Sequence, residues 1–413
     1  MSPRQPKPAV HFALVIALGA LLLLVPSSRA TAQIPGQLTD EAFWKIVEES
    51  SEPDGQFISE NFLSNEQGYQ YVIPPVLDKV KSGGAYLGVG PEQNFTYMAA
   101  VHPNIAFIID IRRQNMIEHL LYKAIFEMSA NRAEFLSTLF CREPATKLAA
   151  DLRVEELFEA FSSLPPDPEL YSRNLQLVKD RLWKQHQFGL TKEDETSLEH
   201  VYSIIARQGT NLGYSVDALT NVFVRETAPG NPAEPFTPAN VSRTITILPS
   251  TPAQPGNPGI LLGTTLQFPN YTQLMTATDA EGKNWSYLAN ETNYQSVREL
   301  ELNNRIVPIV GDFSGPKAIQ AVAQYLKDHD TTVSVFYLSN VEQYLSPPEI
   351  FRKFYSNVAT LPLNSSSTFI RSSQGSGAQP GVAQSSFSPI QDVLDAVMDG
   401  RVLRQSDIFR VFH

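Results

Sequence analysis

Short apolar runs alternate with stretches of helical hydrophobic spacing in two separate parts of the chain. In residues 83–116 an apolar run leads into a glycine-containing turn, a short helical stretch and a second apolar run at 105–110. Short runs of this kind are typical of strands buried on both faces of a parallel sheet. We therefore predict a strand, a turn, a helix and a second strand that ends at Asp110, followed by a long helix that begins at Ile111.

The same alternation returns in the second half of the chain. Apolar runs predict strands at 306–310, 332–338 and 367–371, and helical spacing predicts the helices around them. The Ser/Gly/Gln-rich residues 372–387 are expected to be irregular, since they offer little to bury. Helices are predicted at 293–303, 316–329, 348–357 and 388–399, and, before the first block, at 39–50 and within 67–80.

The residues between the two blocks follow a different pattern. Helical stretches are predicted near 130–140, 151–163, 167–186 and 193–208, and prolines then recur at every third residue for part of 229–258, around one strand at 244–248. Such a proline-rich segment favours an extended connector. We expect a mainly helical insertion that caps or flanks the carboxyl edge of the strands. The predicted divisions are 1–32, 33–126, 127–292, 293–371 and 372–413.

The first 32 residues have the pattern of a secretory signal peptide. Arg4 and Lys7 precede an apolar run at 12–25, Pro26 breaks that run, and small residues around Ala32 offer a cleavage site. The run is short for a membrane span, which needs about 20 residues. We predict cleavage after Ala32 and export to the periplasm or the medium, with an uncleaved membrane anchor as the alternative.

Composition narrows the classes of partner. The apolar fraction of 42% and the charged fraction of 18% are those of a globular protein, and the formal charge of −11 disfavours non-specific binding to nucleic acid. A single cysteine, Cys141, excludes an internal disulfide, and the seven histidines lack the spacing of a zinc-binding helix. We expect a small-molecule ligand, no bound metal and no nucleic acid, and the sequence leaves the oligomeric state open.

Candidate binding residues gather at the expected strand ends. Gly88 and Gly90 would let the backbone approach a ligand, and Asp110 follows at the distance of a carboxylate that accepts ribose hydroxyls. A plain tight turn and an ion pair of Asp110 with Arg112 or Arg113 are the alternatives. The two arginines would grip a substrate carboxylate or phosphate, or else lie on a solvated face.

Further candidates lie before and after this unit. Glu92 or Asn94 would contact an amino-acid moiety, although Asn94 would equally cap the helix at Phe95. Asn65 and Glu66 lie just before the first helix of the core and are polar enough to contact a substrate, or else cap a loop; the resemblance described below implies that this segment folds over the ligand. These assignments predict a ligand crevice at the carboxyl ends of the strands.

These residues carry a resemblance to a known family. Residues 86–116 resemble the first two strands of class I S-adenosylmethionine-dependent methyltransferases, and Val310-Gly311-Asp312-Phe313 and 336–341 resemble their third and fourth strands. Residues 88–97 and 336–345 also resemble a bacterial family of unknown function with this fold. The likeness covers two blocks, 84–125 and 293–345. It departs from the family pattern where Tyr86-Leu87 replaces the usual acid and Pro91-Glu92 replaces the third glycine.

The resemblance implies a doubly wound α/β fold, mostly parallel, with S-adenosylmethionine as cofactor. Asn340 would then be the catalytic or substrate-facing residue, and Asp312 and Phe313 would bond and stack on the adenine. The cofactor contacts implied are Gly88, Gly90, Glu92, Asn94, Asp110, Asp312 and Phe313. Two hypotheses stay open at this point: a methyltransferase acting on a small molecule, and an exported binding or scaffold protein that kept the fold and lost the reaction.

Overall fold

A six-stranded sheet forms the centre of the protein. In this computed structural model, which describes residues 33–57, 59–214, 225–226, 243–247, 264–374 and 383–412, the strands are ordered β6-β2-β1-β7-β8-β9. The expected signal peptide at 1–32 and much of the proline-rich connector lie outside the described residues. The strands are β1 (Ala85–Gly88), β2 (Ile105–Asp110), β6 (Ile306–Val310), β7 (Val333–Ser339), β8 (Thr368–Gln374) and β9 (Ala383–Pro389).

The sheet is parallel except at one edge. β1 pairs in parallel with β2 on one side and with β7 on the other, and β2 with β6 and β7 with β8 are also parallel. The chain thus winds outward from β1 in both directions. The strand order reverses between β1 and β7, and ligands of open α/β sheets bind outside the carboxyl ends of the strands at such a point. The α/β class and the Rossmann-like arrangement are confirmed.

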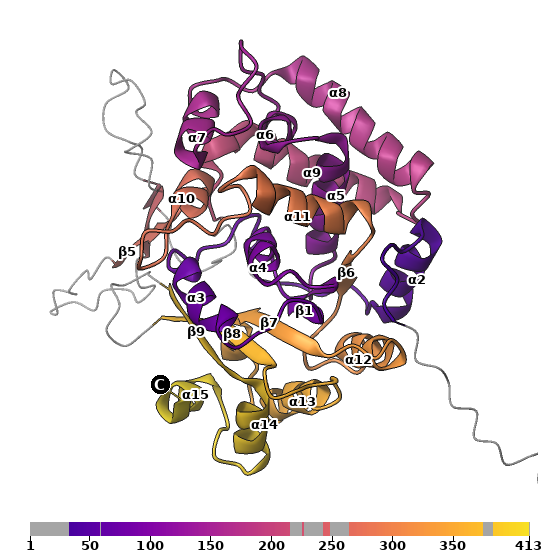
Figure 1. Cartoon of the computed structure of the whole chain (residues 1–413), viewed down its shortest axis with the longest axis vertical. Helices are drawn as coiled ribbons and strands as arrows, with labels where there is room; N and C mark the ends of the chain where they lie inside the picture. Colours follow the sequence, from indigo (N-terminus) through magenta and orange to yellow (C-terminus); the bar gives the residue numbers. More distant parts are fainter. Residues whose placement is uncertain are drawn as a thin grey trace, which may run out of the picture. The chain divides into compact units, whose positions relative to one another are not determined.

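Helices cover both faces of the sheet (Figure 1). Above the sheet in this view lie α4 (Gln93–Val101), α5 (Arg113–Met128) and α11 (Glu291–Leu302), and below it lie α12 (Ala318–Asp328), α13 (Pro348–Val358) and α14 (Ile390–Met398). Every residue of β1, β2 and β6 is buried, which explains their nearly continuous apolar sequence. Helix α2 (Asp40–Ser50) packs against β6 and α12.

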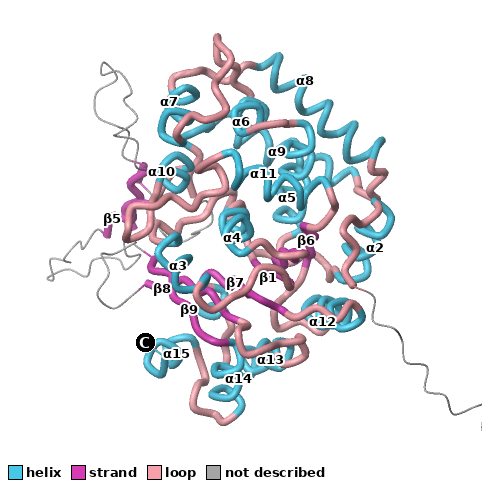
Figure 2. The backbone as a smooth tube through the Cα atoms, viewed as in Figure 1, coloured by secondary structure: helices cyan, strands magenta, loops and turns pink. Residues whose placement is uncertain are grey.

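The long insertion between β2 and β6 is largely helical, as Figure 2 shows. The insertion packs on α5 chiefly through α9, and α6 packs against both α5 and α9. It also contains a three-stranded antiparallel sheet, in which β4 matches the single strand predicted there. Its elements are α6 (Arg132–Phe140), α7 (Val154–Ser162), α8 (Pro168–Lys179), η2 (Asp180–Gln185), α9 (Lys192–Gln208), η3 (Gly209–Asn211), β3 (Arg225–Glu226), β4 (Arg243–Ile247), β5 (Thr264–Phe268) and α10 (Tyr271–Thr276).

One predicted irregular segment is ordered in part. Residues 372–387 were expected to be loose, but β8 continues to Gln374 and β9 begins at Ala383, with the two strands antiparallel. The backbone hydrogen bonds that pair the two strands do not depend on apolar side chains, so serines are accommodated here, for example Ser372 opposite Ser385. The C-terminal helix α15 (Gln405–Phe412) was not predicted.

Three short elements complete the description. Tyr69–Val72 form η1 and Ile73–Leu77 form α3, which lies within the stretch 67–80 where a helix was predicted and has prolines in its first turn. Val341–Tyr344 form η5 directly after β7. Within the described part of the chain, no helix combines the length and the apolar character that crossing a membrane requires.

Candidate functional site

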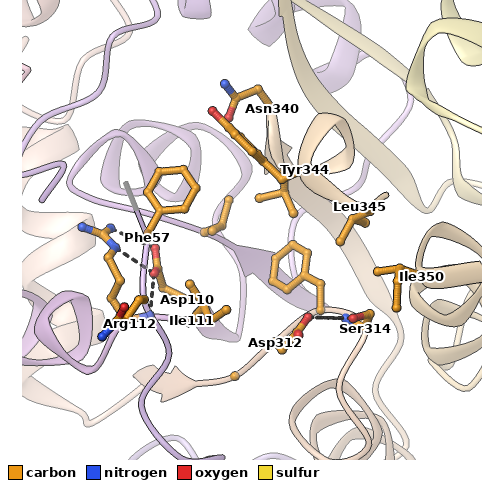
Figure 3. A pocket seen from close by; sticks show the side chains of 15 residues that line it. Phe57, Asp110, Ile111, Arg112, Asp312, Ser314, Asn340, Tyr344, Leu345 and Ile350 are labelled. Carbon is orange, nitrogen blue, oxygen red and sulfur yellow. Dashed lines mark hydrogen bonds and ion pairs between the residues drawn. The ribbon is translucent and has the colours of Figure 1, made fainter. Parts of the chain in front are cut away.

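A cavity of about 450 Å³ opens at the carboxyl ends of β1, β2, β6 and β7 (Figure 3). Its size lies within the usual range for a small-molecule site. It coincides with the reversal of strand order, where the fold predicts a ligand. The lining residues are Gln56, Phe57, Val89, Asp110, Ile111, Arg112, Gly311, Asp312, Phe313, Ser314, Asn340, Val341, Tyr344, Leu345 and Ile350.

The cavity is an apolar slot with polar groups at its margins. Figure 3 shows Phe57 beside Asp110 on one side of the cavity, Leu345 and Ile350 on the opposite side, and Tyr344 between them, below Asn340. The rings of Phe57 and Tyr344 meet edge to face at 5.1 Å between centroids, and this contact joins the loop before β1 to η5. Such a slot suits a flat, mostly apolar ring system whose edges carry hydrogen-bonding groups.

Asp110 ends β2 and is held by the arginine that follows it. Its Oδ1 accepts hydrogen bonds from the Arg112 backbone N–H (2.9 Å) and Nε (3.1 Å), and its Oδ2 accepts one from a terminal guanidinium nitrogen (3.1 Å). Arg112 also donates to the carbonyl oxygen of Glu60. Burial lowers the pKa of Arg112, but the charge of Asp110, its hydrogen bonds and the charge of Glu118 together outweigh burial, so the net shift is upward. The predicted ion pair and the predicted cavity position of Asp110 are therefore both present.

Asp312 lies just beyond β6, and a carboxylate from another segment lies beside it. Asp312 Oδ1 accepts hydrogen bonds from the backbone N–H and the hydroxyl of Ser314 (2.8 and 2.9 Å). Glu52 accepts hydrogen bonds from the backbone N–H groups of Lys317 (2.8 Å) and Ala318 (3.0 Å), at the start of α12. A helix N-terminus attracts anions, and here the protein supplies its own carboxylate. This position therefore does not accommodate a ligand phosphate.

Hydrogen bonds from the Asn94 side chain hold the glycine turn after β1 in place. Asn94 Nδ2 donates to the carbonyl oxygens of Val89 (3.0 Å), Gly90 (3.2 Å) and Pro91 (2.7 Å), and its Oδ1 accepts from Tyr86 (2.9 Å). A Cβ on Gly88 would lie 1.9 Å from this Oδ1, and Gly90 has a φ of 76°. Gly90 thus allows the positive φ of the turn, and Gly88 leaves room for the Asn94 side chain. Val89, between them, lines the cavity.

The predicted acids before α4 lie behind the turn, away from the cavity lining. Glu66 accepts hydrogen bonds from Tyr337 (2.8 Å), Ser339 (2.5 Å) and Gln93 (3.0 Å), and burial raises its pKa. Glu92 is the residue before α4 and is fully buried, and burial raises its pKa to about 8. Asn65 is half-buried beside Glu66.

Arg113 belongs to another interface. Its guanidinium donates two hydrogen bonds to Asp194 of α9, at 2.6 and 2.8 Å, and so joins α5 to the insertion. Of the predicted site residues, those that line the cavity are Asp110, Arg112, Asp312, Phe313 and Asn340. Those that do not are Gly88, Gly90, Glu92, Asn94, Asn65, Glu66 and Arg113.

Several lining residues escaped the sequence analysis. Phe57 and Gln56 come from an irregular loop, and Tyr344, Leu345 and Ile350 follow β7 without a recognisable motif. The one available signal was topological, because residues just after a strand at the reversal point are placed to line a crevice. Within the described residues, no group of three or more His, Cys, Asp or Glu side chains is arranged to hold a metal ion.

Comparison with protein families gives one match. A family model described as "Domain of unknown function (DUF7790)" matches residues 61–195 and 260–398, which together make up most of the chain. The match takes in both α/β blocks and helices α6 to α8 of the insertion. A search of curated proteins found no match.

Proposed function

The chain belongs to the family described as "Domain of unknown function (DUF7790)", and for this member we propose that the cavity binds S-adenosylmethionine and serves methyl transfer to a small molecule. The observation that carries the proposal is the apolar slot whose lining includes Asp110, at the end of β2, and Asp312, just beyond the neighbouring strand β6. Ribose hydroxyls would donate to Asp110 and an adenine amino group to Asp312, with Phe313 beside the ring. This arrangement favours the class I methyltransferase type among Rossmann-like folds.

The electrostatics of the site favour a nucleoside that carries no phosphate. Glu52 already accepts the hydrogen bonds of the first N–H groups of α12, and Glu92 occupies the residue before α4. Both helix N-termini that would attract a phosphate are therefore next to carboxyl groups of the protein. The formal charges of the lining residues are two carboxylates and one guanidinium, which suits a neutral or cationic ligand such as a sulfonium.

Asn340 is the group we assign to the methyl acceptor. It follows β7, lines the cavity, and its side-chain amide forms no hydrogen bond with another described residue. The amide would orient an acceptor hydroxyl or amine toward the sulfonium methyl. S-adenosylmethionine would supply an electrophilic methyl group at this position, and Asn340 would hold the acceptor, which would lose one proton as it takes up the methyl group.

Calorimetric titration with S-adenosylmethionine and S-adenosylhomocysteine tests the binding. We expect micromolar affinity for both, and no binding of ATP or NADH. Asp312→Ala should weaken binding about 10- to 150-fold, since a lost hydrogen bond to a charged group costs roughly 1.5–3 kcal/mol. The matched control is Ser314→Ala, which removes a hydrogen bond to Asp312 but leaves the carboxylate in place. Equal affinities of the two variants, or no binding by the wild type, would refute the proposal.

An exported binding or scaffold protein without methyl transfer is the second candidate. Tyr86, which stands where the resembling family has an acid, is directed to Asn94, and both oxygens of Asp110 are already paired with Arg112. An exported protein would also lack a supply of a cofactor made in the cytoplasm. N-terminal sequencing of the protein recovered from cells tests the export: a start at Gln33 supports cleavage after Ala32, and a start at Met1 or Ser2 contradicts it.

A further inference from the structure

Five buried side chains near the N-terminal ends of α4 and α5 carry polar atoms without a partner. Both carboxylate oxygens of Glu118, Asn115 Nδ2 and His119 Nδ1 form no hydrogen bond within the described part of the chain. The Glu92 carboxylate and the Tyr122 hydroxyl also lack a partner at ordinary hydrogen-bond geometry, although the backbone N–H groups of Glu92 and Ser64 lie close enough to lower the pKa of Glu92, and Tyr271 that of Tyr122. Each residue is at most 2% exposed. We call these five residues the α4–α5 seam.

The seam is a continuous feature of the helix packing. Asn115, Glu118 or His119, and Tyr122 are spaced by three or four residues and therefore share one face of α5. Phe95 of α4 packs edge-on against His119 (5.6 Å) and against Tyr122 (5.2 Å). His119 Nε2 is 2.8 Å from the carbonyl oxygen of Gly90. This face of α5 thus meets the first turn of α4, where Glu92 lies.

Acidic and aromatic groups surround Glu92. Glu66 lies on one side, held by Gln93, and its charge adds to the rise in the Glu92 pKa that burial produces. On the other side burial raises the pKa of Glu118, and the charge of Glu92 adds to this while Arg112 opposes it. Four tyrosines also lie close enough for the charge of Glu92 to raise their pKa values: Tyr69, Tyr122, Tyr271 and Tyr287.

Among the described residues, no basic side chain forms an ion pair with either acid. Arg112, the cation that acts on Glu118, already forms two hydrogen bonds to the side chain of Asp110, and burial keeps the neighbouring His119 neutral by lowering its pKa to about 4. Leaving a buried polar atom unpaired costs about 1–3 kcal/mol, so a cluster of them in a folded protein requires a reason. A bound ligand that donates hydrogen bonds supplies one.

The chemistry of the ligand follows from the donors and acceptors available. An anion is excluded by the carboxyl groups, and the described acids are not grouped to chelate a metal ion. Carboxylates bordered by tyrosine rings are the surroundings that bind alkylammonium groups, through ion pairs and cation–π contacts. We propose that the α4–α5 seam is a binding site for a small aliphatic amine, with Glu92 and Glu118 as its carboxylate partners.

Binding is coupled to release of protons. A free carboxylic acid in the seam must lose its proton to the solvent before it can pair with the ammonium ion, which enters with its own charge intact. Each ammonium that pairs with one carboxylate therefore displaces one proton, and affinity rises up to tenfold per pH unit as the pH approaches the pKa of Glu92, about 8. This site is separate from the nucleoside cavity and does not depend on it.

Titration of the full-length protein with 1,4-diaminobutane, n-butylamine and 1-butanol tests the assignment. We expect both amines to bind more tightly at pH 8 than at pH 6, with about one proton released per bound ammonium, and the neutral alcohol not to bind. Calorimetry in two buffers of different ionisation enthalpy measures the released protons. Glu92→Gln and Glu118→Gln preserve shape and remove the ionisable proton, and each should weaken amine binding at least tenfold.

The controls separate a specific site from surface association. Glu155→Gln changes an exposed glutamate of α7 and should leave amine binding unaltered. Amine affinity that is the same in Glu92→Gln and wild type, or equal binding of the alcohol, would overturn the proposal. So would no binding at 10 mM amine and pH 8, which would mean that only water satisfies the seam. None of these results bears on S-adenosylmethionine binding, which Asp312→Ala tests by itself.

Discussion

Replacing Glu92 with glutamine should change how the stability of the fold depends on pH. Burial raises the pKa of Glu92 from 4.5 to about 8 in the folded chain. Between these two values the folded protein keeps a proton that the unfolded chain has lost, so stability falls as the pH rises. From pH 5 to pH 8 this group alone should lower the free energy of unfolding by about 3 kcal/mol. Glutamine cannot ionise, so the variant should lack this part of the loss.

Urea denaturation at pH 5 and pH 8, followed by circular dichroism, measures the effect. The wild type also contains Glu66, Glu118 and Glu301, whose pKa values burial raises, so its own stability should fall further than Glu92 accounts for. The difference between the wild type and Glu92→Gln isolates one group. That difference should change by about 1 M in the urea midpoint between the two pH values. A change below about 0.3 M would show that Glu92 is already ionised at pH 5, and the reasoning would fail.

Two further predictions concern the turn and a histidine. Gly90→Ala should cost about 1–2 kcal/mol because of the positive φ alone, whereas Gly88→Ala should cost more than about 3 kcal/mol because its Cβ would meet Asn94 Oδ1, and urea midpoints compare the two. Burial lowers the pKa of His186, but the hydrogen bond to Glu127 (2.9 Å), the charge of Glu127 and the hydrogen bond to Asp40 together raise it more, so the net shift is upward. The stability that protonated His186 contributes to the fold is therefore complete below the unfolded-state pKa of about 6.5, and it is lost as the pH rises through the pKa of the folded state. His186→Gln should accordingly destabilise the protein by about 1–2 kcal/mol at pH 5.5 and by less at pH 9, and equal losses at both would contradict this.

The sequence predicted the strands of the sheet and the residues at their ends. Apolar runs with few polar interruptions located β1, β2, β6 and β7, because a strand that is buried on both faces is apolar at nearly every position. Asp110 ends β2, Asp312 lies two residues beyond β6 and Asn340 follows β7, so topology alone brings them to one edge. The sequence was therefore sufficient to predict that these three residues lie together in one cavity.

The remainder depends on contacts that no local pattern reveals. Glu52 accepts hydrogen bonds from residues about 265 positions later, and nothing around it in the sequence indicates a helix N-terminus. Asn94 follows a glycine turn as a cofactor-binding residue would, yet its amide is directed back to the turn. Strands β8 and β9 are polar near their joined ends, and there the order comes from the backbone pairing. Glu118 lies within a helix that has many apolar residues, and that pattern gave no indication of a buried carboxylate.

The position of the insertion has a consequence for how the chain acquires its fold. β2 pairs with β6 across about 200 intervening residues, and β1 has β7 as its second neighbour, still later in the chain. Contacts so distant along the chain form slowly, because a long loop must close before they can stabilise anything. A chain emerging from the ribosome therefore cannot give β1 both of its neighbours until about four fifths of the chain have been made. The central sheet would stay incomplete during most of the synthesis of the chain.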